Sequence, residues 1–238
     1  MKPIYLLAIP AALVLYAAVS GVLLFRQVAA WRDYWQHRNA EQSSAQALVY
    51  VALGDSAAQG IGAARPDQGY VGEFARRLSQ QHGRPVRVIN LSKSGARVQD
   101  VLRDQLPELS RYHADVVTLD IGGNDIASFD AATFRSQWRE LLQGLPAGTF
   151  VADVPYFGGR SQLPLFGSGR LEQLVQFANE IIRELSADAP VVLVPLHDAT
   201  KQRNGRAPWN YAIDYFHPST QGYRAWTDVF WEAYQKHS

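Results

Sequence analysis

The chain has 238 residues, of which 47% are hydrophobic and 19% charged, and its formal net charge is +1. This length and composition indicate one folded domain with a sizeable core and exclude a disordered chain. The near-zero charge provides no basic field for nucleic acid, and the absence of cysteine excludes disulfides, thiolate metal sites and a cysteine nucleophile.

The chain begins with an apolar segment. Residues 3–25 contain no charged side chain and lie between Lys2 and Arg26. About 20 such residues cross the core of a bilayer, whereas the apolar part of a cleaved signal peptide usually has about 7–15. A buried helix of a soluble core normally keeps a polar face. We therefore expect residues 1–27 to form an uncleaved transmembrane helix.

Residues 28–46 have the features of a stalk between this helix and the domain. Trp31, Tyr34 and Trp35 closely follow the apolar run, where amphipathic aromatic side chains suit a membrane interface. Residues 41–44 have the composition of a polar linker. The folded domain is accordingly predicted at residues 47–238.

From residue 47 the chain alternates between short apolar runs and segments with helical periodicity. The apolar runs, which are the predicted strands, are 47–53, 86–91, 115–121, 149–154 and 190–196. The predicted helices are 70–81, 97–110, 131–143, 169–187 and 219–235. This alternation predicts a three-layer, doubly wound α/β fold of the flavodoxin-like kind, in which about five parallel strands lie between two layers of helices.

Polar residues follow each predicted strand. The carboxyl ends of parallel strands share one edge of the sheet, and ligands bind there. The sequence therefore brings polar groups from distant positions to one edge. They are Gly54-Asp55-Ser56, Ser94-Gly95, Gly122-Gly123-Asn124-Asp125, Asp153, and His197-Asp198, with Asp214 and His217 before the last helix.

Three of these residues have the chemistry of a nucleophile with its base. A serine nucleophile needs a base within hydrogen-bond reach and a group that orients the base. His217 is the candidate base for Ser56, and Asp214, three residues earlier, can reach its second ring nitrogen. Pro218 favours the start of the last helix just after His217. Acyl transfer also needs donors for an oxyanion, and the candidates are the side-chain amide of Asn124 and the backbone N–H groups of Gly95 and Ser56.

These residues resemble the four sequence blocks of the SGNH hydrolases, or GDSL-type esterase/lipase family. The Ser of Gly-Asp-Ser, the Gly of the second block, the Asn of Gly-x-Asn-Asp and the His of Asp-x-x-His correspond to Ser56, Gly95, Asn124 and His217. The resemblance covers residues 48–236, although the first block continues with alanine instead of leucine. It implies a metal-free, cofactor-free serine esterase with Asp214 as the third triad residue. Residues 54–58 do not fit Gly-x-Ser-x-Gly, which disfavours an ordinary α/β-hydrolase.

Alternative interpretations of the same residues remain open. His197 is a rival base, but in an extended chain Asp198 would point to its opposite side. Asp55, Asp125 and Asp153 follow strands, as in a metal-assisted phosphohydrolase, which would leave Asn124 without a role. A non-catalytic, membrane-tethered binding module is a third possibility.

The substrate and the side of the membrane are only outlined by the sequence. Segments 155–170 and 201–216 are rich in Gly, Pro and aromatic residues, which suit either sugar rings or acyl chains. The partner is thus a small-molecule, glycan or lipid ester. The positive-inside rule applied to the arginines after residue 25 places the domain in the cytoplasm, whereas the family resemblance favours an extracytoplasmic domain, which we expect. The candidate substrate walls are Tyr156, Phe157, Phe166, Trp209 and Tyr211.

Overall fold

The computed structural model describes residues 4–41, 44–157, 168–204 and 207–237. Its centre is a five-stranded, fully parallel sheet with the strand order β2-β1-β3-β4-β5. The chain leaves β1 in one direction to β2 and then returns to β3 on its other side, so the switch point lies between the carboxyl ends of β1 and β3. The strands are β1 (Leu48–Gly54), β2 (Val86–Asn90), β3 (Val116–Asp120), β4 (Phe150–Ala152) and β5 (Val192–Val194).

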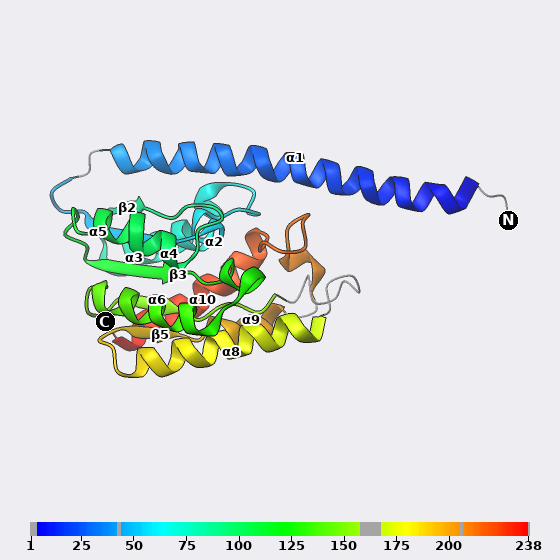
Figure 1. Ribbon diagram of the computed structural model, residues 1–238. Helices are drawn as coiled ribbons and strands as arrows, with labels where there is room; N and C mark the ends of the chain where they lie inside the picture. Colours follow the sequence, from blue (N-terminus) through cyan, green and yellow to red (C-terminus); the bar gives the residue numbers. More distant parts are fainter. Residues whose placement is uncertain (1–3, 42–43, 158–167, 205–206, 238) are drawn as a thin grey trace.

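Helices cover both faces of the sheet, as the near-continuous apolar strands require. Tyr50 and Ala52 of β1 pack into one core with α3 (Tyr70–His82) and α10 (Thr220–His237). Val51 and Leu53, which point to the opposite face, pack into the other core with α6 (Ala131–Gly144) and α8 (Ser168–Ala187). Figure 1 shows the sheet between these two layers. The predicted three-layer parallel α/β fold is therefore confirmed.

One predicted helix and one predicted strand differ in the structure. The helix expected at 97–110 consists of α4 (Val98–Asp100), a π-helical turn η2 (Val101–Gln105) and α5 (Leu106–Leu109). The fifth strand is shorter than predicted, because Leu196 already begins a further helix, α9 (Leu196–Asn204), directly after Pro195. The short elements are α2 (Ser56–Gln59), η1 (Pro66–Gln68), η3 (Asp125–Ser128) and η5 (Pro208–Asn210).

The N-terminal segment is a single helix, α1 (Ile4–Ala40), which continues well past residue 27. In Figure 1 its C-terminal half lies along the domain and its N-terminal half projects beyond it. Among the described residues, α1 is the one helix long and apolar enough to cross a membrane. Residues 28–40 thus differ from the expected stalk, because they are helical and packed on the domain.

Several side chains of α1 bind the domain, among them Gln27, Trp31, Trp35 and Asn39. Trp35, which is 3% exposed, lies in the core beside α3 and donates its indole N–H to Gln59 O at 2.9 Å. Asn39 exchanges two hydrogen bonds of 2.9 Å with the backbone of Asn90, so it satisfies polar groups at the edge strand β2. The expectation that Trp35 lies at a membrane interface is therefore wrong: its ring is part of the hydrophobic core.

Candidate active site

The first element of the site is the turn between β1 and α2. Gly54 has a φ of +144°, and a Cβ there would lie 2.3 Å from the backbone oxygen of Asp120, so the turn needs glycine. Asp55 follows as the N-cap of α2, with its side chain accepting the Ala57 N–H at 2.9 Å. This sharp turn places Ser56 at the first position of α2, above the switch point of the sheet.

The second element is the loop before α10. One Asp214 oxygen accepts the backbone N–H groups of Phe216 and His217, both at 3.0 Å. Tyr215, between them, has a φ of +53° and is the only non-glycine residue with positive φ in the described part of the chain. The loop is closed where Ala212 N–H donates to His217 O at 2.8 Å. These bonds fix the direction in which the imidazole projects.

The two elements bring Ser56, His217 and Asp214 into one hydrogen-bonded chain. His217 Nε2 lies 2.9 Å from Ser56 Oγ, although the two residues are 161 positions apart. His217 Nδ1 lies 2.6 Å from the second Asp214 oxygen. Burial acts to raise the pKa of Asp214, but the hydrogen bond from His217, the imidazole charge and two backbone N–H groups outweigh it and lower that pKa. Asp214 is therefore an ionised acceptor, which favours the proton on Nδ1 of a neutral imidazole and leaves Nε2 to accept from serine.

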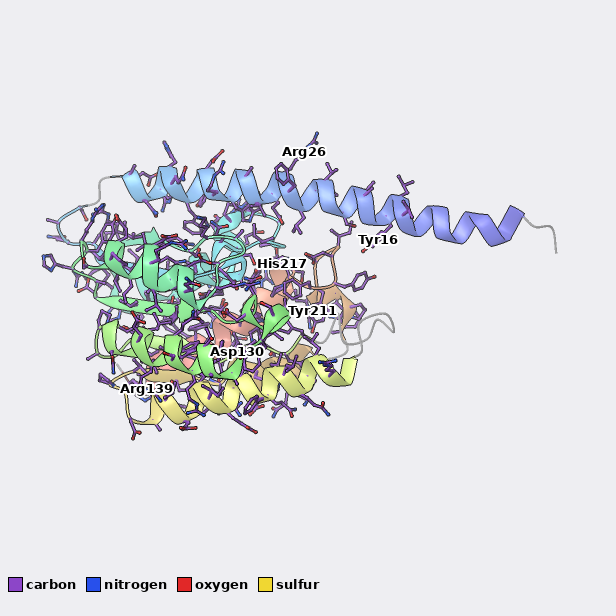
Figure 2. The ribbon with its side chains drawn as sticks, in the orientation of Figure 1. Tyr16, Arg26, Asp130, Arg139, Tyr211 and His217 are labelled. Atoms are coloured by element: carbon purple, nitrogen blue, oxygen red, sulfur yellow. The ribbon has the colours of Figure 1, made fainter. Side chains whose placement is uncertain are left out.

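A pocket opens at Ser56 and His217, with aromatic side chains around it. Phe157 and Phe216 stack with ring centroids 5.1 Å apart, and Phe216 also meets the His217 ring edge-on at 5.0 Å. Figure 2 shows Tyr211 and His217 on the side of the domain that faces the overhanging part of α1. The pocket is lined by Asp55, Ser56, Ala57, Asp120, Gly123, Pro155, Tyr156, Phe157, Thr200, Asn210, Tyr211, Phe216, His217, Pro218 and Trp226.

The predicted substrate walls are only partly found at this pocket. Tyr156, Phe157 and Tyr211 line it. Trp209 is not among the described residues that line it and is 64% exposed, so its role as a wall stays a prediction. Phe166 lies outside the described residues. Asp120, which also lines the pocket, is not among the residues predicted from the sequence, although it lies at the end of a predicted strand, where polar residues are candidates.

The loop with Gly95 is tied to the nucleophile turn from two sides. Gln59 donates to Ser92 O at 3.0 Å and accepts from Ser94 Oγ at 2.5 Å. Gly95 itself has a φ of +80°, and a Cβ built on it meets no described atom within 4 Å. Its backbone thus adopts a conformation that favours glycine, on a loop held beside α2.

Asn124 is placed differently from what the sequence led us to expect. Its Nδ2 donates to Asp55 Oδ2 at 3.0 Å and to Ala96 O at 2.9 Å. These two bonds join the ends of β1 and β3 to the Gly95 loop. Both amide hydrogens are therefore occupied, and neither Asn124 nor Gly95 is among the residues that line the pocket.

Two of the residues that line the pocket, Asp55 and Asp120, are buried carboxyl groups. Burial raises the pKa of Asp55. Burial and the neighbouring charge of Asp55 raise the pKa of Asp120 well above its usual value. One oxygen of Asp120 has no hydrogen-bond partner among the described residues. Both carboxyl groups therefore favour their protonated form more than a solvent-exposed aspartic acid does.

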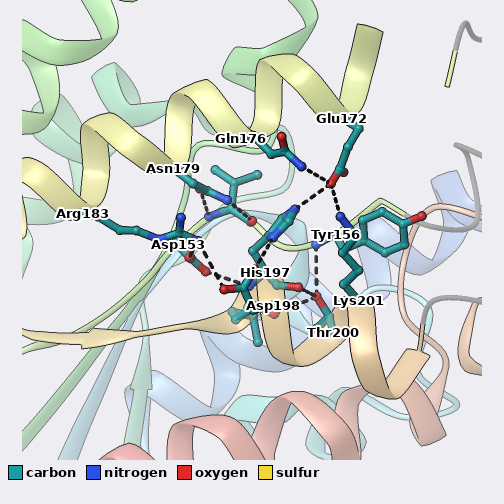
Figure 3. A network of polar contacts seen from close by, with 12 residues as sticks. Asp153, Tyr156, Glu172, Gln176, Asn179, Arg183, His197, Asp198, Thr200 and Lys201 are labelled. Carbon is teal, nitrogen blue, oxygen red and sulfur yellow. Dashed lines mark hydrogen bonds and ion pairs between the residues drawn. The ribbon is translucent and has the colours of Figure 1, made fainter. Parts of the chain in front are cut away.

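The rival base His197 belongs to another network, shown in Figure 3. Its Nδ1 lies 3.0 Å from Asp198 and its Nε2 lies 3.3 Å from Glu172. Asp198 can reach it because both residues are in the first turn of α9 and not in an extended strand, which corrects the sequence argument. His197 does not line the pocket, and the neighbouring Asp153 binds Arg183 at 2.9 Å.

The aspartates of the phosphohydrolase alternative do not converge. Asp153 is engaged by Arg183 and by the backbone N–H of His197, whereas Asp125 accepts the Val98 N–H at 3.3 Å. Across residues 4–41, 44–157, 168–204 and 207–237, no group of three or more His, Asp or Glu side chains has the arrangement of a metal site. Nothing in this donor set favours a metal-assisted reaction.

Known proteins resemble this chain in sequence or in fold. A family model described as the GDSL-like lipase/acylhydrolase family matches residues 52–225. The spore germination lipase LipC of Bacillus licheniformis is 23% identical over 201 residues, which cover 76% of this chain and 93% of that protein. The crystal structure of TesA has a TM-score of 0.64 at 21% identity, covering 79% of this chain and 98% of its own. An acetyl xylan esterase of Geobacillus stearothermophilus has a TM-score of 0.59 at 22% identity, covering 80% and 95%.

The matched segment contains the β1–α2 turn, the Gly95 loop, the Asn124 turn and the Asp214–His217 loop. The chain belongs to the GDSL-like lipase/acylhydrolase family, and the predicted family is confirmed. It is accordingly a carboxylic ester hydrolase.

Proposed function

We propose that the protein hydrolyses carboxylic esters through an acyl-enzyme formed on Ser56. The observation that carries the proposal is the continuous contact from Ser56 Oγ to His217 Nε2 and from His217 Nδ1 to Asp214, at the mouth of an aromatic pocket. This is the arrangement that a serine nucleophile requires. A non-catalytic binding module would have no use for a base and its orienting carboxylate.

The proposed reaction has two halves. Ser56 Oγ attacks the ester carbonyl carbon while its proton passes to His217 Nε2, and the imidazolium is stabilised by the ionised Asp214. His217 then gives that proton to the leaving alcohol, which departs as the C–O bond breaks. In the second half, His217 takes a proton from water, the hydroxide attacks the acyl carbon, and Ser56 regains the proton as the acid leaves.

The proposed oxyanion donors are the backbone N–H groups of Ser56 and Gly95 and the side-chain amide of Asn124. The Ser56 N–H lies at the start of α2, and the Gly95 loop is tied to α2 through Gln59. Asn124 can donate to an oxyanion only if it gives up its bond to Asp55 or to Ala96. We favour exchange of the Asp55 bond, because protonation of that buried carboxyl would weaken its hold on the amide.

The N-terminal half of α1 is proposed as a membrane anchor with the domain on the extracytoplasmic side. Its large apolar side chains are exposed in the described part, including Leu15, Val22 and Phe25, and lipid would cover them. We test the side by protease treatment of intact cells: digestion of the domain supports the extracytoplasmic side, and protection until lysis refutes it.

The chemical proposal is tested by turnover of a short-chain nitrophenyl ester by the full-length protein in mild detergent. Wild type should turn over the ester with and without EDTA, and Ser56→Ala should be inactive while its circular dichroism spectrum is unchanged. Loss of wild-type activity on chelation, restored by a divalent metal, would support the phosphohydrolase alternative instead.

A further inference from the structure

The turn that follows α2 touches both halves of the candidate active site. We call residues 60–63 the exit segment. The Ile61 N–H donates to Ser56 O at 3.0 Å, so the exit segment folds back on the first residue of α2. A Cβ at Gly62 would lie 2.9 Å from His217 Cβ, so the backbone there packs directly against the residue that carries the candidate base. The position of the exit segment therefore bears on the distance between Ser56 and His217.

Helix α1 holds the exit segment through two side chains. Gln27 uses both ends of its amide: Oε1 accepts the Gly62 N–H and Nε2 donates to Ala63 O, each at 2.9 Å. One turn later, Trp31 donates its indole N–H to Gly60 O at 3.0 Å. In Figure 1, α2 and the turn after it lie beside α1. Three of the four residues of the exit segment are thus bonded through their backbone to α1.

These two side chains lie outside the part of the chain that the family shares. The family model matches residues 52–225, which include the exit segment but no residue of α1. The exit segment is a turn and belongs to no helix or strand, so the bonds from α1 add directly to those that fix its position. In this chain, an additional helix therefore supports the turn between the candidate nucleophile and its base.

We propose that Gln27 is a positioning residue for ester hydrolysis: it holds the exit segment where Ser56 Oγ stays within hydrogen-bond reach of His217 Nε2. This inference rests on the proposed function. Gln27 is not among the described residues that line the pocket, so its loss should affect kcat and not KM. A displacement of about 1 Å between reacting groups costs about 10² in rate, and a partial displacement costs less.

The proposal is tested with Gln27→Met in the full-length protein, because methionine keeps the length of the side chain but removes both bonds. Asn39→Leu is the matched control. Asn39 is also on α1 and also exchanges two bonds of 2.9 Å with the backbone, but its partner is Asn90 of β2 and not the exit segment. Turnover of a short-chain nitrophenyl ester is measured in mild detergent over a range of concentrations, together with the melting temperature.

Gln27→Met should lower kcat by about tenfold and leave KM within about twofold. Asn39→Leu should leave both constants within about twofold, although the melting temperature of both variants falls. An equal loss of kcat in the two variants would overturn the proposal, because weaker attachment of α1 in general would then be the cause. A lower melting temperature with unchanged kcat in Gln27→Met would also overturn it, because Gln27 would then serve stability alone.

Hydrogen exchange gives an arm that does not use activity. Followed by mass spectrometry, exchange at residues 60–63 should be faster in Gln27→Met than in wild type and unchanged in Asn39→Leu. Trp31→Phe, which keeps a ring but loses the bond to Gly60 O, should show a smaller increase and a smaller loss of kcat. Unchanged exchange in Gln27→Met overturns the proposal at its first step. An inactive wild type refutes ester hydrolysis and the positioning role with it, whereas an active wild type with an unaffected Gln27→Met refutes the positioning role alone.

Discussion

Trp35→Ala tests whether the second half of α1 belongs to the folded domain. The Trp35 side chain is 3% exposed, packs with the α3–α10 core and donates a hydrogen bond to the last residue of α2. Truncation of a buried tryptophan to alanine costs about 3–5 kcal/mol. At about 2–4 °C per kcal/mol for a domain of this size, the melting temperature should fall by about 6–20 °C.

The assay is thermal unfolding of the full-length protein in mild detergent, followed by near-UV circular dichroism. Trp209→Ala is the matched control, because its 64% exposed ring should change the melting temperature little. A Trp35→Ala variant that melts within about 2 °C of wild type would refute the packing of Trp35 in the core and would favour the predicted stalk at residues 28–46 instead. A chain starting near residue 40 should also be destabilised, since it lacks the hydrogen bonds that the indole N–H groups of Trp31 and Trp35 donate to Gly60 O and Gln59 O.

Three further predictions concern the site. Asn124→Ala should lower kcat for a short-chain ester by about 10²–10³, the usual effect of losing an oxyanion donor; a folded variant with unchanged kcat would leave Asn124 only its structural bonds. Asp214→Asn should lower kcat by about 10⁴, because the amide no longer favours the Nδ1 proton on His217, and a loss below tenfold would argue against this role. Asp120→Asn should raise the melting temperature at pH 8 but not near pH 4. The raised pKa of Asp120 makes the folded protein retain a proton that the unfolded chain releases. Wild-type stability therefore falls as pH rises through that pKa. An unchanged pH dependence in the variant would show that the pKa of Asp120 is not raised in the folded protein.

The parallel fold could be predicted because its strands are continuous apolar runs and its helices repeat every three to four residues. The switch point then located Ser56 and the Asn124 turn at one edge, since both follow strands that are neighbours in the sheet. Distances could not be predicted in this way. The approach of His217 to Ser56 depends on the closed loop at 211–218, whose bonds involve backbone groups that carry no sequence signal.

The errors have physical reasons as well. Trp35 follows an apolar run, and composition alone cannot tell an interfacial aromatic residue from one that packs on a domain. His197 was assigned to a strand exit because residues 190–196 are apolar, but Pro195 ends that run and starts a helix that brings Asp198 to the same side. The engaged amide of Asn124 depends on Asp55 and Ala96, which are distant in sequence.

The central claim is that Ser56 is the nucleophile activated by His217, and covalent labelling tests it most directly. A fluorinated alkyl phosphonate probe is incubated with the full-length protein, and the modified peptide is identified by mass spectrometry. We predict a single adduct on Ser56, with labelling strongly slowed in His217→Ala and absent in Ser56→Ala. An adduct on another serine, or unchanged labelling of Ser56→Ala, would contradict the assignment.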